Sequence, residues 1–565
     1  MRELIEPGMV IHKDVPIRLR DGREVFGNIF LPKGAGRWPV ILNYSPYGKD
    51  VHFSNFLPNV WDQLVEQLPE IRANSSLRHL TFESPDPEVW TRFGYAVLRV
   101  DSYGSGKSAG TLHPNSPQEF LDAAEVVEWA ANAEWSNGKV GLLGISYYAA
   151  GQWMIAQHKP AGLAAIQPWQ GTSDFYRDRT RQGGLYSNGF VDFWWNDCVL
   201  DNQNGNASSR YVDYFTGERN TGVPLTESEL AANRFDYKQD IQDHPLEDEW
   251  YASRSADLTN IEVPALVVAN WGGLAAHLRG TILGYEGINS AEKWLRIQRG
   301  NYFLTFYDPQ NVDIQRRFFD RFLKGDEKAW QDEPRVRVEV RAANDTIAAT
   351  IDAKEWPIPK TEEHRLHLDG STMSLSTQPP RETSTVTYAA LTEEATFSTG
   401  PLAEAVSFAG PISLKLRFAS STEDADVFVA LRAYHQDGTE IGFDAVSDPH
   451  SPVSLGWLRA SHRRIDTNKS GFLRPFHSHR ELEPLQPGHP YDLEVEVWPA
   501  SLVLPVGAEL RLTLSGHNLV DGATYRHDDP TDRPVSLFGG RHAFITGPSA
   551  ASFLSLPSIH RVIEE

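Results

Sequence analysis

The sequence predicts an α/β domain with a mostly parallel sheet, followed by an all-β sandwich. In the first half, short β-rich runs that end in turn residues alternate with helical spacing, as in "PQEFLDAAEVVEWAANAEW". Such alternation is typical of a parallel sheet covered by helices on both faces. In the second half, apolar and polar residues alternate every two positions, which is the period of antiparallel strands with one solvated face.

The expected strands and boundaries follow in chain order. The first domain has the β-rich runs "VPIRLRDGREVFGNIFLP", "WPVILNYSPYG", "YAVLRVDSYGSG", "KVGLLGISYY" and "VPALVVANW". Residues 51–88 interrupt this rhythm and resemble an insertion. Residues 171–255 are rich in Trp, Tyr, Asn and Asp without clear strands, so we expect a helical cap over the site. The α/β domain then comprises residues 1–170 and 256–329.

The predicted sandwich covers residues 330–565. Its expected strands include "PRVRVEVRA", "GPISLKLRFAS", "ADVFVALRAY", "YDLEVEVWPAS" and "AELRLTLSG", which Gly and Pro turns separate. With 565 residues the chain is long enough for two or three domains with cores of ample size.

Composition excludes several classes of function. The 53 Lys and Arg against 75 Asp and Glu give a formal net charge of -22, which argues against a nucleic-acid partner. Cys198 is the single cysteine, so no internal disulfide framework is expected. No segment has the roughly 20 apolar residues of a membrane span, and the start lacks a signal-peptide core. We expect a cytoplasmic protein that does not bind membranes.

Neither a cofactor nor a metal ion is predicted. The 19 histidines include no H-x-x-x-H or H-E-x-x-H pattern. The stretch "YGSGKSAG" resembles the end of a phosphate-binding loop, but Asp101 stands where that loop needs glycine. We therefore expect a small-molecule substrate without a nucleotide.

Ser146 is the candidate nucleophile. The buried-strand pattern "KVGLLG" precedes it and the helix-compatible "YYAAGQWMIAQH" follows it. A serine at a sharp strand-to-helix turn exposes its hydroxyl, and the next backbone N–H, here of Tyr147, points to where an oxyanion forms. Tyr148 occupies the last glycine position of the G-x-S-x-G pattern, and a serine that only caps the helix is the alternative.

Several motifs, in this order, resemble the cocaine esterase and X-prolyl dipeptidyl aminopeptidase (CocE/NonD) group of serine hydrolases. They are "LRVDSYGSGKSAG", "VVEWAANAEWSNGKVGLLGISYYAAGQW", "KWLRI", "QRRFFDRFLKG", "GWLRASHR" and "EVWPASLVLPVGAELRLTLSG". The resemblance covers nearly the whole chain. It implies an α/β-hydrolase core with a helical cap, plus a C-terminal jelly-roll sandwich.

The same resemblance suggests an oxyanion hole. In this group a tyrosine in an early "PY" loop donates its hydroxyl to the oxyanion, and Tyr47 of "NYSPYGK" matches that position. Tyr47 O–H and Tyr147 N–H are then the two expected donors. The alternative for Tyr47 is a core aromatic residue at the end of a strand.

The acid and the histidine of the expected triad are missing. Gly273 stands where many relatives have the aspartate, and "QRGNYFLTFYD" has no histidine, with Tyr302 at the catalytic position. His277 is the nearest candidate base, with Asp308 or Asp313 as its orienting acid. A histidine that packs the helix or lines the pocket is the alternative. Tyr302 is expected to donate a hydrogen bond, because a tyrosine is a weak base near neutrality.

Three functions remain open. The first is a serine hydrolase that acts on a small, largely apolar ester, amide or acyl compound. The second is a repurposed enzyme that uses the same pocket as a cyclase, isomerase, lyase or acyltransferase, for example in specialised metabolite biosynthesis. The third is a non-catalytic binding protein on the same scaffold. The resemblance also leaves a homo-oligomer open, because sandwich faces in this group can mediate self-association.

Overall fold

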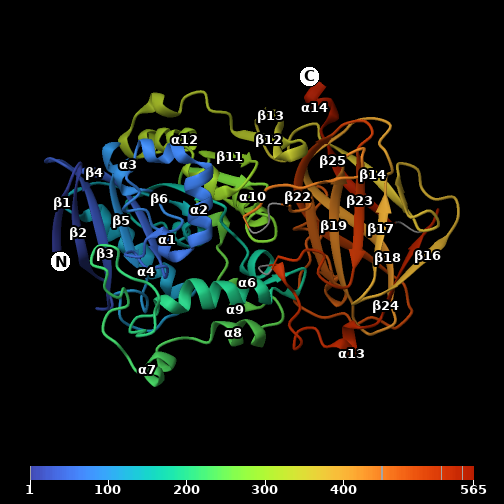
Figure 1. The fold of residues 1–565 in the computed structure, drawn as a ribbon, viewed down its shortest axis with the longest axis horizontal. Helices are drawn as coiled ribbons and strands as arrows, with labels where there is room; N and C mark the ends of the chain where they lie inside the picture. The colour runs from blue at the N-terminus through green and yellow to red at the C-terminus, as the bar shows by residue number, and fades with distance from the viewer. Residues whose placement is uncertain (1, 447–449, 523–524, 550–551, 565) are drawn as a thin grey trace.

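The computed structural model describes residues 2–446, 450–522, 525–549 and 552–564. Figure 1 shows an α/β domain, blue to green, beside a β-rich domain in orange and red. The N-terminus lies at the far end of the α/β domain. Within the described residues, no helix combines the length and the apolar character that crossing a membrane requires.

The first sheet has the order β1-β2-β3-β5-β4-β6-β7-β10-β11-β12-β13. Its strands are β1 (Arg2–Glu6), β2 (Met9–Arg18), β3 (Glu24–Pro32), β4 (Trp38–Ser45), β5 (Ala96–Asp101), β6 (Ser136–Ile145), β7 (Leu163–Trp169), β10 (Ala265–Asn270), β11 (Lys293–Gln298), β12 (Val336–Arg341) and β13 (Ile347–Ala353). The pairings from β5 to β12 are parallel, so the carboxyl ends of the central strands meet at one edge.

Helices cover both faces of this sheet, as predicted. One face packs on α4 (Pro117–Asn132), α5 (Tyr147–Ala156) and α10 (Leu278–Gly287), and the other packs on α3 (Pro87–Arg92) and α12 (Pro309–Phe319). Successive strand residues contribute to opposite cores. In β6, for example, Leu142 belongs to the first core and Leu143 to the second. This alternation explains the continuous apolar runs in the sequence.

Two segments of short helices lie outside the sheet. The segment 51–88 forms α1 (Phe53–Phe56), α2 (Pro58–Gln67) and the short helix η1 (Pro69–Ala73) before α3 begins. The segment 171–255 forms η2 (Phe175–Thr180), β8 (Arg181–Gln182), β9 (Leu185–Tyr186), α6 (Asn188–Phe193), η3 (Trp194–Val199), η4 (Leu200–Asn202), α7 (Glu227–Ala232), α8 (Tyr237–Asp243) and α9 (Glu249–Ala252), and η5 (Leu258–Asn260) follows it. We call these two segments the first and the second lid segment.

The first two strands after residue 330 pair with the first sheet and not with the sandwich. The segment "PRVRVEVRA" forms β12, which pairs in parallel with β11, and β13 then pairs antiparallel with β12. Both strands therefore belong to the first sheet. Alternation at the edge of a sheet resembles alternation in a sandwich, so the two-residue period alone did not distinguish these positions.

The C-terminal domain is all-β, as predicted. Its strands are β14 (Glu362–Asp369), β15 (Ser374–Ser376), β16 (Ser384–Ala389), β17 (Glu394–Ser398), β18 (Val406–Ser420), β19 (Asp426–Tyr434), β20 (Glu440–Ile441), β21 (Ser454–Arg459), β22 (Tyr491–Leu504), β23 (Glu509–Ser515), β24 (Arg541–Thr546) and β25 (Phe553–Ser558). Because β18 also pairs with β25, the sheet closes on itself around one core.

Shorter helices connect these parts. They are α11 (Tyr302–Tyr307), η6 (Asp320–Lys324), η7 (Glu327–Trp330), η8 (Ala343–Asp345), η9 (Ala460–His462), α13 (Val535–Phe538) and α14 (His560–Glu564). Of these, α11 directly follows the carboxyl end of β11.

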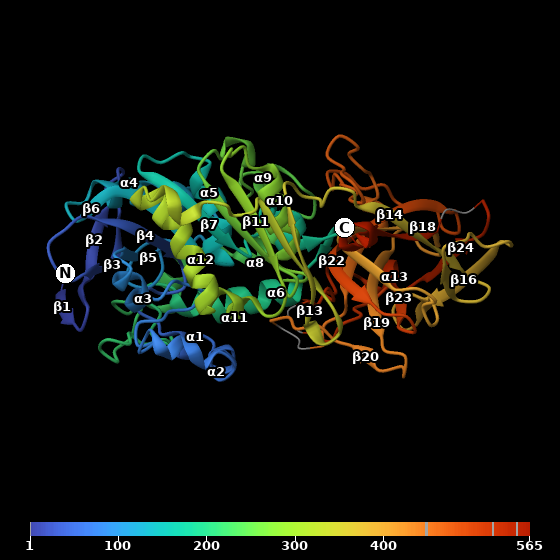
Figure 2. The same ribbon diagram turned by 90° about the horizontal axis from the view of Figure 1, so that it is seen from above.

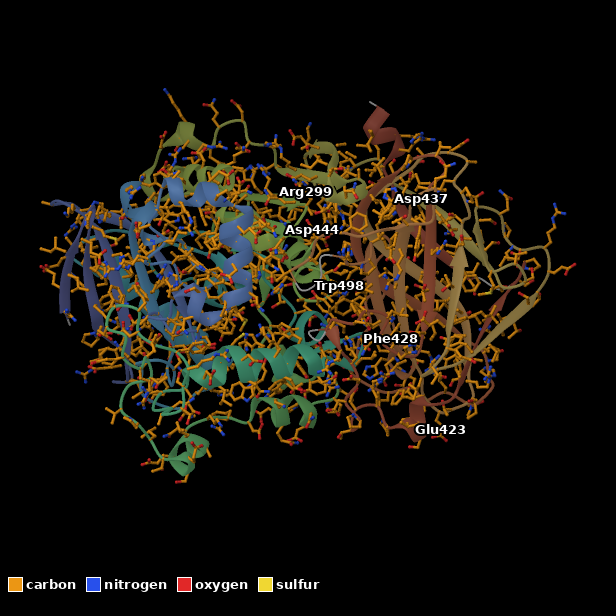
Figure 3. The ribbon with its side chains drawn as sticks, in the orientation of Figure 1. Arg299, Glu423, Phe428, Asp437, Asp444 and Trp498 are labelled. Carbon is orange, nitrogen blue, oxygen red and sulfur yellow. The ribbon has the colours of Figure 1, made fainter. Side chains whose placement is uncertain are left out.

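The two domains share a buried junction. Figure 3 places Arg299, Asp444 and Trp498 along it, whereas Glu423 and Asp437 lie at opposite ends of the sandwich. Trp498 belongs to the same apolar core as the helices on one face of the first sheet. The junction is therefore continuous with the interior of the α/β domain.

Arg279 of α10 connects three parts of the chain at this junction. Its Nη1 donates to Asp178 in the second lid segment at 2.7 Å, and its Nε donates to Glu496 of β22 at 2.8 Å. The arginine is 2% exposed and Asp178 is fully buried. The pair therefore positions the lid segment and the sandwich against the helix that begins beside the site.

Replacing Arg279 with methionine should destabilise the protein by about 3–5 kcal/mol, because a buried carboxylate loses its partner. Denaturant unfolding of the full chain measures this. The control is Arg365→Met, whose partner Glu363 is on the solvated side of β14, and there we expect about 0–1 kcal/mol. Equal losses in both variants would contradict this role of Arg279.

Candidate active site

Ser146 lies in a strained turn at the carboxyl end of β6. Its backbone has φ 55° and ψ −109°, a conformation that residues other than glycine rarely adopt. The turn leads directly into α5. Such a strand-turn-helix arrangement lifts a serine hydroxyl away from the backbone, as the sequence predicted.

Gly144 permits this turn despite the departure from G-x-S-x-G. A Cβ at position 144 would lie 2.6 Å from the Cβ of Tyr148 and 3.1 Å from the carbonyl oxygen of Glu83. The first glycine of the motif is therefore required here. The position of the second glycine accommodates Tyr148, whose hydroxyl accepts a hydrogen bond from Ser45 at 2.8 Å.

Ser146 faces a largely apolar cavity of about 400 Å³. Both lid segments contribute to its wall, and the sandwich contributes Val446 and Tyr525. The apolar and aromatic lining residues include Leu57, Val60, Phe82, Phe190, Phe193, Trp194, Leu274 and Phe303. The polar groups are few, as in sites that enclose a small organic molecule.

His277 meets Ser146 in this cavity. Its Nε2 lies 2.9 Å from Ser146 Oγ, within hydrogen-bond distance. The imidazole stands at the N-terminus of α10, just after the carboxyl end of β10. The loop after β10 therefore brings the histidine beside the serine, although the two are 131 positions apart in the chain.

No acid orients His277 within the described residues. Its Nδ1 is buried and has no hydrogen-bond partner there. The prediction that Asp308 or Asp313 orients His277 is wrong, because both carboxylates have other partners. Asp308 accepts the N–H groups of Gln310 and Asn311 at the start of α12. Asp313 pairs with two arginines of that helix. Short-range helix capping and i,i+3 or i,i+4 pairing account for both carboxylates.

Burial determines the protonation of His277. It lowers the pKa of the imidazole to about 3, and the positive charge of Arg179 acts in the same direction. The imidazole is therefore neutral near pH 7. Without a carboxylate to stabilise the imidazolium, it is a weaker base than an ordinary histidine.

Of the two expected oxyanion donors, Tyr47 lines the same cavity as Ser146, and Tyr147 directly follows Ser146 at the start of α5. The Tyr47 hydroxyl, just beyond β4, accepts a hydrogen bond from the indole N–H of Trp194 at 2.9 Å. An indole can only donate, so the hydrogen of the Tyr47 hydroxyl remains available to another acceptor. The Tyr147 amide follows Ser146, while the Tyr147 side chain donates to buried Glu119 at 2.5 Å.

Tyr302 begins α11 beside the histidine. Its ring centre lies 5.4 Å from that of His277 in an edge-to-face arrangement, and both rings line the cavity. Burial raises the pKa of the Tyr302 hydroxyl well above 10. The tyrosine therefore remains protonated near neutral pH and retains its capacity to donate.

Two titratable groups of the cavity were not predicted from the sequence. Glu83 of the first lid segment and Cys198 of the second both line it. Burial raises the pKa of each group, so the thiol is protonated at neutral pH. No sequence motif marks Glu83, which follows an irregular segment without strand or helix periodicity.

No metal site accompanies these groups. In the part of the chain that the structure describes, no three His, Cys, Asp or Glu side chains are grouped so as to hold a metal ion.

Two domain families match the chain. Residues 21–302 match the X-Pro dipeptidyl-peptidase (S15 family) domain, and residues 328–555 match the X-Pro dipeptidyl-peptidase C-terminal non-catalytic domain. The second match includes β12 and β13, although these strands pair within the first sheet.

Curated relatives cover the chain to different extents. A cocaine esterase from Rhodococcus is 25% identical over 65% of this chain, and the alignment spans 64% of that enzyme, just under two thirds of its length. A putative Xaa-Pro dipeptidyl-peptidase from Rhodopirellula baltica is 24% identical over 84% of this chain and 77% of its own length.

Solved structures share the complete fold. A CocE/NonD family hydrolase from Staphylococcus aureus has a TM-score of 0.85 and 29% identity, covering 97% of this chain and 94% of that one. An α-amino acid ester hydrolase, at 18% identity and a TM-score of 0.69 over 98% of this chain and 97% of its own, shares the fold. The α/β-hydrolase core, the C-terminal β domain and the two matched domains together show that this chain belongs to the X-Pro dipeptidyl-peptidase (S15) family and its CocE/NonD hydrolase relatives.

Proposed function

We propose that this protein is a serine hydrolase that cleaves small, largely apolar esters or amides through an acyl-enzyme on Ser146. The observation that carries the proposal is the 2.9 Å contact between Ser146 Oγ and His277 Nε2 in a largely apolar cavity. A nucleophile within hydrogen-bond reach of a base is the arrangement that covalent catalysis requires.

In the proposed reaction, Ser146 Oγ attacks the carbonyl carbon while its proton passes to His277 Nε2. The carbonyl oxygen becomes an oxyanion that Tyr47 O–H and Tyr147 N–H stabilise. As this intermediate collapses, the leaving oxygen or nitrogen takes up a proton and departs as the alcohol or amine. Water then attacks the acyl carbon, the bond to Ser146 Oγ breaks, and Oγ regains a proton as the carboxylic acid is released. The cavity volume limits the substrate to a compact molecule, and its aromatic wall favours an apolar acyl group.

A second candidate is a repurposed enzyme that uses the pocket without hydrolysis. Nδ1 of His277, which has no hydrogen-bond partner among the described residues, favours it, because a triad acid normally fixes the tautomer in which Nε2 accepts the serine proton. Such an enzyme would rely on the hydrogen-bond donors of Tyr47 and Tyr302. Its Ser146 would react slowly with probes that require an activated serine.

The absent acid cannot simply be restored at position 273. A Cβ on Gly273 would lie 2.4 Å from Oε1 of the fully buried Gln170, whose Nε2 donates to the carbonyl of Asn270 at 3.0 Å. An aspartate would therefore displace Gln170 and place a carboxylate beside its amide oxygen. Gln170 would therefore have to shift before an aspartate could occupy position 273.

We expect a fluorophosphonate to label Ser146, and His277→Gln to slow that labelling by about 10²- to 10⁴-fold, because a positioned base contributes that much. Intact-mass measurement follows the reaction. Ser146→Ala should abolish labelling and the surface variant His158→Gln should leave it unchanged. Rapid labelling that survives His277→Gln would exclude His277 as the base.

The same probe reports the protonation state of His277. Because its pKa lies at about 3, Nε2 stays unprotonated as the pH falls, and the labelling rate should remain constant between about pH 7 and about pH 5. A rate that halves near the ordinary histidine pKa of about 6.5 would contradict the burial effect. No labelling at any pH, with turnover of a native substrate intact, would favour the repurposed enzyme.

Tyr47→Phe should lower kcat/KM for ester hydrolysis by about 10²-fold or more, because one oxyanion donor is lost. It also leaves the Trp194 indole without its acceptor, at a cost of about 1–3 kcal/mol in stability. Tyr388→Phe, which removes another buried hydroxyl in the sandwich, is the matched control for stability. An unchanged kcat/KM in Tyr47→Phe would remove Tyr47 from the oxyanion hole.

Gly273→Asp should fail to increase ester hydrolysis and should destabilise the protein by about 1–3 kcal/mol through overpacking. Thermal unfolding and ester kinetics measure both effects. Adding Gln170→Gly should recover stability, since Gln170 has φ 59° and glycine adopts that conformation readily. Wild-type stability in the single variant would show that the loop relaxes around the new side chain.

A further inference from the structure

The carboxyl group of Glu83 lies in the catalytic cavity but has no part in the reaction proposed above. Glu83 is 2% exposed, lines the same cavity as Ser146, and leaves its Oε2 without a hydrogen-bond partner among the described residues. Its backbone has φ 59°, a strained value for a glutamate. A strained backbone and a buried carboxyl oxygen without a described partner, both in one residue, point to a functional role.

The backbone of Glu83 is attached to the turn that carries the nucleophile. Its carbonyl accepts the N–H of Ile145, the residue before Ser146, at 3.1 Å. The Ser146 hydroxyl and the Tyr147 amide both lie close enough to the carboxyl group to favour its ionised form. The carboxyl group is therefore held beside the reacting hydroxyl and the expected oxyanion hole.

Burial nevertheless outweighs these two contacts and raises the pKa of Glu83 well above its ordinary value. For His277, which also contacts Ser146, burial lowers the pKa to about 3. The usual order of the two pKa values is thus reversed: the pKa of the Glu83 carboxyl group is raised and that of the His277 imidazole is lowered to about 3. Environments that separate two titratable groups in this way identify an acid and a base.

We infer that Glu83 is a catalytic residue, the proton donor that works together with His277 at Ser146; this inference rests on the proposed function. In acylation, the Ser146 proton passes to His277 Nε2 as the Oγ–carbon bond forms. As the bond from carbon to the leaving oxygen or nitrogen breaks, that atom takes the proton of Glu83. The acyl-enzyme then carries a Glu83 carboxylate and a His277 imidazolium.

Deacylation reverses the two proton transfers. The Glu83 carboxylate takes a proton from water as its oxygen bonds to the acyl carbon. The bond between that carbon and Ser146 Oγ breaks, and Oγ takes the proton of the His277 imidazolium. The carboxylic acid is released, and Glu83 and His277 return to their neutral forms.

This scheme explains how the site works without a permanent triad acid. An imidazolium alone would be costly in this buried cavity, because no described residue forms a hydrogen bond with its Nδ1. Glu83 becomes an anion as His277 becomes a cation, so the two together gain no net charge. The counter-ion exists only in the acyl-enzyme, where it is needed.

The inference defines the substrate class more narrowly. An acid beside the leaving group matters little for a phenolate, which departs readily without a proton. It matters greatly for an alkyl alcohol or an amine, which is a poor leaving group unless it is protonated. We therefore infer that the substrates are compact apolar esters of alkyl alcohols, or amides, instead of activated aryl esters.

Glu83→Gln tests this role, because glutamine keeps the shape and polarity of the side chain but cannot transfer a proton. For a phenylacetate ester of an alkyl alcohol, kcat/KM should fall by about 10²- to 10³-fold. For the corresponding nitrophenyl ester, kcat/KM should change less than about fivefold, and a burst followed by slow turnover should appear as deacylation loses its base. Glu88→Gln, in the same region with an exposed carboxyl bonded to Ser76, is the matched control and should match the wild type.

Equal losses for the two esters, or no loss for either, would overturn the role of Glu83. Should the variant fold poorly, the wild type alone provides the test. Its kcat/KM across a series of leaving groups should depend weakly on their basicity, and a steep decline with basicity would overturn the inference. Failure of the proposed function gives a different result: the wild type would neither react with a fluorophosphonate nor hydrolyse either ester.

Discussion

The strained backbone of Ser146 is the constraint on which the rest of the site depends. Three backbone hydrogen bonds hold it: Ile145 N–H to Glu83, Ser146 N–H to Trp169 at 3.1 Å, and Ala150 N–H to the Ser146 carbonyl at 2.8 Å. A residue in this conformation costs about 1–3 kcal/mol, and it persists only where the surroundings enforce it. The turn therefore couples the nucleophile to a lid segment, a neighbouring strand and its own helix.

Arg179 is a buried positive charge that acts on both His277 and Glu83 in the cavity. Arg179 is buried, lies 4.2 Å over the Trp194 ring, and has two donor nitrogens without hydrogen-bond partners among the described residues. Its field opposes an imidazolium and favours a carboxylate or an oxyanion. The same Trp194 ring donates to Tyr47, so the cation and one expected oxyanion donor are joined through one side chain. A site of this kind suits the transient negative charge of an acyl transfer.

The sequence was sufficient to predict the two folds and the serine turn, because strand and helix periods and the glycine before a nucleophile are local signals. The sequence left two interpretations of His277, a base or a residue that packs the helix or lines the pocket. No local pattern shows that the loop after β10 turns back to β6. Glu83 was not predicted, because its proximity to Ser146 arises from an insertion that lacks periodicity. The pairing of β12 and β13 with the first sheet was not predicted for a similar reason: strand pairing partners are not encoded in a two-residue period.

The close approach of the sandwich to the loops of the α/β domain has a consequence for how the protein matures. Gly272 has room for no side chain, because a Cβ there would lie 2.4 Å from the carbonyl of Asp444, one of the residues that Figure 3 labels at the junction. The last strand of the first sheet ends at residue 353, so the whole sheet is synthesised well before Val446 and Tyr525, which complete the cavity wall. During synthesis the nucleophile turn can therefore form first in an open cleft, and the complete cavity is a property only of the finished chain.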